Sequence, residues 1–199
     1  MELSIPTNSS KLSVKMTIQK KTIRDKIIFL DSCILLNCEG IVFKDKIRQV
    51  LRDLTDQSNK LLISEYSRFE VMKNARFQDN FKYFDKLLDF LGNIPISKES
   101  LISASALTRL YGRNKKTINF GDYIIGGTVV ATKESLLLTS NNKDFCKPYW
   151  KTVEKNYVLY ELEDAYNVLN IHLIEPDREK IKKEYLEDRN KKYCTNNKN

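Results

Sequence analysis

The stretch IIFLDSCILLN, residues 27–37, decides the fold and raises the first question about function. Its first four residues are apolar and mostly β-branched or aromatic, which is typical of a buried strand rather than a helix. Asp31 then interrupts the apolar run. An ionised carboxylate in such surroundings loses several kcal/mol to desolvation unless a partner compensates or the strand ends there. Asp31 therefore needs a specific explanation.

Further apolar runs along the chain predict more strands, separated by segments with helical spacing of apolar residues. Strands are expected at 61–63, 135–140, 158–162 and 171–176. Helices are expected over 43–60, from Ser64 through Met72, around 81–91, from Ser97 to Gly112, over 122–131, and briefly between 162 and 171. Strands alternating with helices predict a three-layer α/β/α fold with a mostly parallel central sheet.

Length and composition predict one domain with two appendages. The 199 residues, 41% of them apolar, suffice for one well-filled core. We expect a flexible N-terminal arm at 1–26, the folded domain at 27–176, and a charged C-terminal tail at 177–199 that forms a solvated helix or frays. No apolar run approaches the ~18 residues of a membrane span, and the N-terminus lacks a signal-peptide pattern. A cytoplasmic protein without a membrane partner is expected.

Charge and cysteine content narrow the function classes. Lys and Arg outnumber Asp and Glu by 34 to 26, and the net charge of +8 favours polyanionic partners such as nucleic acid. An AT-rich genome explains the same excess of lysine equally well. Four cysteines without C-x-x-C spacing and a single histidine, His172, argue against a zinc site. We expect reduced thiols and a structural histidine.

Polar residues follow several of the predicted strands. In parallel sheets, the functional crevice lies outside the carboxyl ends of the strands. Asp31 ends the first strand, the segment from Ser64 to Glu70 follows the second, and the segment from Asn141 to Asp144 follows the third. We therefore expect three segments that are distant in sequence to meet at one edge.

Four acidic residues belong to this predicted edge: Asp31, Glu70, Asp122 and Asp144, with Asn141 beside the last. Carboxylates gathered closely repel one another unless a cation compensates. Oxygen ligands without nearby His or Cys favour Mg²⁺ or Mn²⁺ over zinc.

Each of these residues except Asp31 also has a structural explanation. The spacing of Ser67 and Glu70 matches a capping box, Asp122 fits a helix N-cap, and Asp144 fits turn chemistry in the loop SNNKD. For Asp122 and Asp144 taken singly, the structural role is the commoner one. The metal hypothesis is excluded only if all three structural explanations are correct at the same time.

The segments FLDSCILLN, ISEYSRFEV, GDYIIGGTVVA and LLLTSNNKDF, in this order, resemble the PIN-domain nucleases, especially the VapC-type toxin ribonucleases. In that family a strand ends in Asp followed by Ser or Thr, as at Asp31 and Ser32. An Asp also opens an apolar helix, where this chain has Gly126 and Gly127 in place of alanines. The resemblance covers residues 27 to about 176.

The resemblance implies hydrolysis of RNA phosphodiester bonds with Mg²⁺ or Mn²⁺ as cofactor. Asp31, Glu70, Asp122 and Asp144 match the metal ligands, with Asn141 or Asp144 completing the site. Ser32, Ser64 and Thr139 match its supporting positions. It also implies a homodimer, and a toxin or defence effector restrained by an antitoxin or other inhibitory partner. The extensions at both ends depart from typical toxins of this type.

Substrate phosphates would meet a basic segment ahead of Asp122, formed by Arg109, Arg113, Lys115 and Lys116. Tyr111 there either stacks on a splayed base or is buried.

Three rival interpretations need to be compared with the sequence. A haloacid-dehalogenase-like phosphatase needs a second Asp two residues after the first, where this chain has Cys33. A receiver-like phosphoacceptor domain needs an acidic pair near the first strand and a late strand-end lysine, and neither pattern is present. The stronger rival is a catalytically silent PIN-fold module for RNA binding or assembly.

Overall fold

A single sheet of six strands forms the centre of the molecule. The computed structural model describes residues 23–38, 44–75, 78–114, 116, 118–145, 147–162 and 165–196. The strands are β1 (Ile27–Leu30), β2 (Lys60–Ser64), β3 (Gly92–Ile94), β4 (Ser135–Thr139), β5 (Trp150–Leu162) and β6 (Ala165–Pro176). Their order across the sheet is β3-β2-β1-β4-β6-β5.

Seven helices accompany these strands in the described part of the chain. They are α1 (Ser32–Asn37), α2 (Lys44–Asp56), α3 (Glu65–Asn74), α4 (Gln78–Phe90), α5 (Lys98–Arg113), α6 (Phe120–Ala131) and α7 (Arg178–Asn196). None of these helices is long and apolar enough to cross a membrane.

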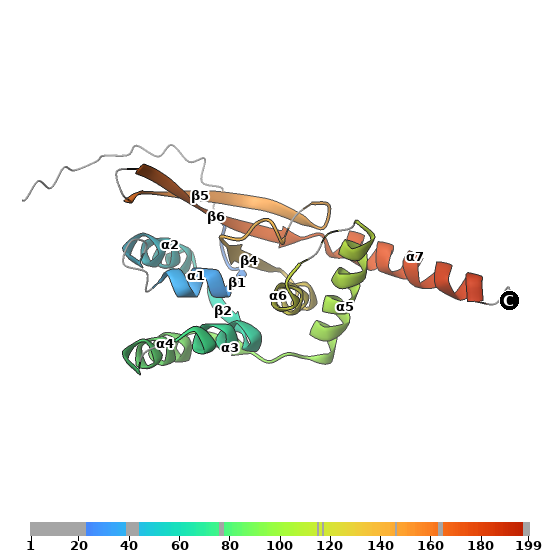
Figure 1. Ribbon diagram of the computed structural model, residues 1–199, viewed down its shortest axis with the longest axis horizontal. Helices are drawn as coiled ribbons and strands as arrows, with labels where there is room; N and C mark the ends of the chain where they lie inside the picture. Colours follow the sequence, from blue (N-terminus) through green and yellow to red (C-terminus); the bar gives the residue numbers. More distant parts are fainter. Residues whose placement is uncertain are drawn as a thin grey trace, which may run out of the picture.

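Alternate residues of β1 face two separate cores. Ile28 and Leu30 pack in a core with side chains of α1 to α4, whereas Phe29 packs in a second core with those of α5 and α6. All three side chains have no exposed surface. Helices therefore cover both faces of the sheet, as Figure 1 shows, and the predicted three-layer α/β/α class is confirmed.

Four neighbouring strands form the parallel part of the sheet. β1 pairs in parallel with both β2 and β4, and β2 pairs in parallel with β3. Leu30 lies opposite Leu138 at the ends of β1 and β4. The expected strand at 61–63 is confirmed with one more residue at each end, and β3 begins directly after the helix expected around 81–91.

The short helix predicted between 162 and 171 is wrong. β5 and β6 form a long antiparallel hairpin that pairs from Trp150 opposite Pro176 to Leu162 opposite Ala165. β6 also pairs antiparallel with β4. Pairing with β5 overrides the weak local helix preference of residues 165–170, and β4 adds a second partner only for residues 172–174.

The charged segment after Pro176 is a helix anchored by Arg178. Its guanidinium donates hydrogen bonds to the carbonyl oxygens of Val129, Val130, Thr132 and Ser135, at 2.7–3.1 Å, in the turn from α6 to β4. Ile181 is buried in the second core. A solvated helix or a frayed tail was expected after residue 176, and the structure has a helix over 178–196. The predicted N-terminal arm lies outside the described residues up to position 22.

Two glycines offer a test of the contact between α5 and α6. A Cβ on Gly127 would lie 2.4 Å from the Ser100 carbonyl oxygen and 2.6 Å from the Ala104 nitrogen, whereas a Cβ on Gly112 would meet nothing within 4 Å. Gly127→Ala should therefore lower the free energy of unfolding by about 1–3 kcal/mol or more. Gly112→Ala, in the same helix pair, should raise it by about 0.5–1 kcal/mol. Urea unfolding followed by circular dichroism measures both; equal effects would contradict the close helix contact.

Candidate active site

The carboxyl ends of β1, β2 and β4 bring the predicted residues to one edge of the sheet. Asp31 directly follows β1, Ser64 ends β2, and Thr139 ends β4. The backbone N–H of Asp31 donates to the Leu138 carbonyl oxygen at 3.0 Å, which fixes Asp31 beside Thr139.

Asp31 is a buried carboxylate surrounded by neutral donors. It is 2% exposed, and Oδ2 accepts hydrogen bonds from Thr139 Oγ1 at 2.5 Å and from Cys33 Sγ at 3.2 Å. Ser32 Oγ lies 3.3 Å from Oδ1. Burial raises the pKa of Asp31 above its usual value, although these hydrogen bonds partly oppose the shift. Burial and the Asp31 charge raise the pKa of Cys33 to about 12, so the thiol stays protonated and donates.

Glu70 points toward Asp31 and does not cap a helix. α3 begins at Ser64, whose Oγ accepts from Ser67 N at 3.0 Å, so the capping box proposed for Ser67 and Glu70 is wrong. Instead, Glu70 Oε2 accepts a hydrogen bond from Ser32 Oγ at 2.7 Å. Ser32 therefore joins the α1 and α3 sides of the site.

Asp122 lies in the first turn of α6 and does not cap it either. The N-cap is Asn119, whose side chain accepts from Gly121 N at 3.2 Å. The pKa of Asp122 is raised to about 8, first by burial, then by the negative charges of Asp31 and Asp144, a hydrogen bond with Asp144, and the charge of Glu70. The carboxylates on α3, on α6, directly after β1 and in the loop after β4 therefore lie close enough to interact electrostatically.

The loop after β4 holds Asn141 and Asp144 in different roles. Asn141 N donates to Thr139 Oγ1 at 2.9 Å, and Asn141 Nδ2 donates to Asp144 Oδ2 at 2.5 Å. Asp144 N lies 3.4 Å from the Asn141 carbonyl oxygen, so the turn geometry is also present. In this structure Asn141 orients Asp144, and Asp144 contacts Asp122.

No cationic side chain of the described residues forms an ion pair with these four carboxylates. In the same part of the chain, no group of three or more His, Cys, Asp or Glu side chains has the geometry of a formed metal cage. Hydrogen bonds within the protein occupy Asp31 Oδ2, Glu70 Oε2 and Asp144 Oδ2. The donor set nevertheless fits Mg²⁺ or Mn²⁺, because these ions take carboxylate and amide oxygens and keep several waters.

The described basic residues that were predicted to bind substrate phosphates contact other groups than the four carboxylates. Arg113 pairs with Asp188 of α7, and Arg109 lies over the Tyr185 ring at 5.8 Å. Lys116 lies over Tyr111 and donates to the Lys143 carbonyl oxygen in the loop beside Asp144. Lys115 falls outside the described residues.

Tyr111 is 2% exposed and packs edge-on against Tyr149 at 5.4 Å, so of the two roles considered for it, burial is correct.

Sequence reasoning missed two residues of the site. The sequence analysis considered Cys33 only as the residue that stands where a haloacid-dehalogenase-like phosphatase needs an Asp. In the structure its thiol donates a hydrogen bond to Asp31. A Cβ on Gly121 would lie 2.4 Å from the Tyr66 ring and 2.8 Å from Glu70 Oε1, so glycine lets α6 approach α3. The adjacent Gly-Asp pair was the available signal. Of the cysteines, Cys33 and Cys38 are free thiols as expected.

Solved structures with a similar fold include VapBC toxin–antitoxin complexes. A chain of VapBC2 from Rickettsia felis, solved with a promoter DNA fragment, superposes with a TM-score of 0.53 and 22% identity over 60% of this chain and 90% of that chain. VapBC-1 from nontypeable Haemophilus influenzae gives 0.51 and 16% over the same shares. A toxin–antitoxin complex from Klebsiella pneumoniae gives 0.50 and 23% over 61% and 92%.

The fold is that of a VapC-type PIN domain. At this identity the likeness concerns the fold alone. No protein-family model and no curated protein matches the sequence. Within the PIN fold, the edge that carries the four carboxylates is the edge where open α/β sheets place their functional sites.

The raised pKa of Asp122 predicts how the stability of the metal-free protein depends on pH. The folded state holds a proton on Asp122 up to about pH 8, whereas the unfolded chain releases it near the ordinary value of 3.8. Folding therefore takes up a proton in this window, so the free energy of unfolding should fall as pH rises from about 4 to 8. Asp122→Asn should flatten this decline. Thermal melts in chelator at several pH values test this prediction. If the melting temperatures of the unsubstituted protein and of Asp122→Asn changed in parallel with pH, the raised pKa of Asp122 would be contradicted.

Proposed function

We propose that the protein is an endoribonuclease that depends on Mg²⁺ or Mn²⁺. The observation that supports this most strongly is the gathering of four carboxylates from four segments. Burial raises the pKa of Asp122 to about 8 together with the nearby charges of Asp31, Asp144 and Glu70. Such a site is unfavourable by itself, and a divalent cation would relieve the repulsion.

Asp31, Glu70, Asp122 and Asp144 are the residues that would hold the ion. A bound ion would offset the charge that develops on the phosphate and lower the pKa of the attacking water. Thr139 and Cys33 would keep one oxygen of Asp31 fixed, and Ser32 would do the same for Glu70. Asn141 would orient Asp144. Neutral donors around charged ligands set their direction without neutralising them.

The RNA substrate and the cytoplasmic location are expectations from the resemblance and composition. The solved neighbours are toxin–antitoxin complexes, and this supports an antitoxin as an inhibitory partner for this chain as well. A homodimer is a further expectation of the same kind. The net charge of +8 agrees with a polyanionic substrate.

The alternative is a PIN-fold module that binds RNA without cleaving it. The hydrogen bonds that occupy Asp31 Oδ2, Glu70 Oε2 and Asp144 Oδ2, and the lack of a formed cage in the described residues, favour this alternative. Cleavage and binding assays on the same preparation separate the two.

Incubation of the purified chain with total RNA tests the nuclease proposal. Cleavage should require Mg²⁺ or Mn²⁺ and stop with excess chelator. Asp31→Asn and Asp122→Asn should each lower the rate by more than the roughly 10 to 100-fold expected when only a ligand's hydrogen-bond partner is lost. Asp85→Asn is the matched control, because Asp85 is half exposed and pairs with Arg68 on α3. Cleavage that survives chelator and both site variants would exclude the metal-dependent mechanism.

Thr139 provides a finer test of the same site. Thr139→Val keeps the shape but removes the donor to the buried Asp31 carboxylate. We expect Mn²⁺ affinity to fall about 10 to 100-fold and stability by about 1–3 kcal/mol, with Thr139→Ser restoring most of both. Calorimetric titration with Mn²⁺ and thermal melts measure these effects. Unchanged affinity in Thr139→Val would show that Asp31 needs no such support.

A further inference from the structure

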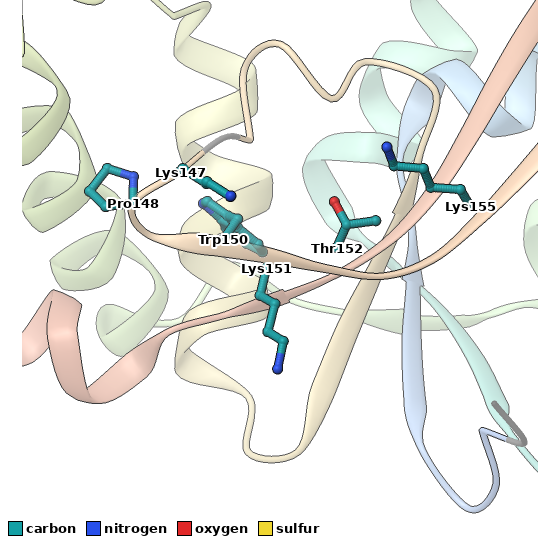
Figure 2. A pocket seen from close by; sticks show the side chains of 6 residues that line it. All are labelled: Lys147, Pro148, Trp150, Lys151, Thr152 and Lys155. Carbon is teal, nitrogen blue, oxygen red and sulfur yellow. The ribbon is translucent and has the colours of Figure 1, made fainter.

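An open pocket lies beside the loop that carries Asn141 and Asp144. It has a volume of about 590 Å³ and is lined by Lys147, Pro148, Trp150, Lys151, Thr152 and Lys155. Its charged lining residues are all lysines. Figure 2 shows Lys147 and Lys155 entering it from opposite ends, and Thr152 between them pointing toward the loop from β4 to β5.

A row of paired residues connects this pocket to the carboxylates. Lys155 of β5 lies opposite His172 of β6, and His172 lies opposite Thr139 of β4. Directly paired residues project to the same face of a sheet, and Thr139 donates to Asp31 on that face. Two strand steps separate Lys155 from Thr139, or about 10 Å.

A β-bulge places a lysine in this row instead of a glutamate. Thr152 lies opposite Ile174 and Glu154 lies opposite Leu173, so Val153 is an extra residue in β5. If the same sequence paired regularly, with Val153 opposite Leu173, Glu154 would lie opposite His172 and Lys155 would project from the other face of the sheet. The bulge therefore determines that Lys155, and not Glu154, lies in this row.

Lysines on an edge strand also have a purely protective role against sheet-to-sheet association, and β5 is an edge strand. Lys151 fits that role, because it lies opposite Glu175 and its side chain runs away from the loop (Figure 2). Lys155 and Lys147 do not fit it, because both side chains are directed into the pocket.

The interior of the same region contains polar atoms without partners. The Trp150 indole nitrogen and His172 Nδ1 are buried and have no hydrogen-bond partner among the described residues. Both residues belong to the pocket or to the row that leads from it. Unsatisfied polar atoms cluster where a ligand or ordered water completes the site.

We propose that Lys147, Thr152 and Lys155 bind backbone phosphates of a single-stranded nucleic acid whose scissile phosphate lies at the carboxylates. This inference rests on the proposed function, since it names the path of that substrate. Phosphate contacts of this kind fix the register of the strand and do not read its sequence.

Binding of a labelled single-stranded RNA oligonucleotide to the full chain tests the proposal. Fluorescence anisotropy is measured in chelator over a series of salt concentrations, with a gel to verify that the RNA stays intact. The double variant Lys147→Gln and Lys155→Gln should weaken binding about 10-fold or more and reduce the slope of log affinity against log salt by about 1.4.

The matched control carries the same loss of charge at the amino ends of β2 and β4. Lys60 begins β2 and Lys133 precedes β4, and both are exposed. Lys60→Gln with Lys133→Gln should change affinity by less than about twofold. Equal losses in both double variants, or no loss in either, would overturn the pocket assignment. Circular dichroism verifies that all variants are folded.

The outcomes separate this inference from the nuclease proposal. RNA binding that depends on Lys147 and Lys155, in a protein that cleaves no RNA with Mg²⁺ or Mn²⁺, would keep the pocket and exclude the nuclease. Cleavage that depends on Asp31, in a protein whose pocket variant binds like the control, would keep the nuclease and exclude the pocket.

Discussion

The site depends on a buried carboxylate at the end of a central strand. Asp31 is 2% exposed and follows a strand whose neighbours on both sides are parallel. The Thr139 hydroxyl donates to it at 2.5 Å, and no cation of the described residues pairs with it. A carboxylate in this position costs stability, which the chain offsets with neutral hydrogen-bond donors. Those donors fix its orientation and leave its charge available.

Glu70 and Asp122 are available to the site because other residues cap the helices that carry them. Ser64 caps α3 and Asn119 caps α6, so neither Glu70 nor Asp122 is used at a helix end. The absence of a side chain at Gly121 lets α6 approach Tyr66 and Glu70. Like charges are thereby brought together, and the proton that Asp122 retains, in its hydrogen bond with Asp144, substitutes for a cation. Exchange of that proton for a divalent ion would convert a strained acidic cluster into a metal centre.

Much of this was predictable from local patterns. The apolar run ending in Asp31 predicts a buried strand, and the order of strands and helices predicts the layers. The capping roles were wrong because Ser64 and Asn119 compete for the same positions, and spacing alone does not choose between neighbouring polar residues. The β5–β6 hairpin was missed because residues 165–170 become a strand by pairing with β5, and the local pattern of these residues does not show that pairing. The same limit applies to Lys155, whose direction depends on the bulge at Val153.

A crystal of the protein grown with MnCl₂ and measured at the manganese absorption edge tests the central claim most directly. The account predicts one anomalous peak among Asp31, Glu70, Asp122 and Asp144, at about 2.0–2.3 Å from carboxylate oxygens, with the Asp122 to Asp144 hydrogen bond broken. An intact hydrogen bond between these two aspartates, with no manganese peak near any of the four carboxylates, would contradict it.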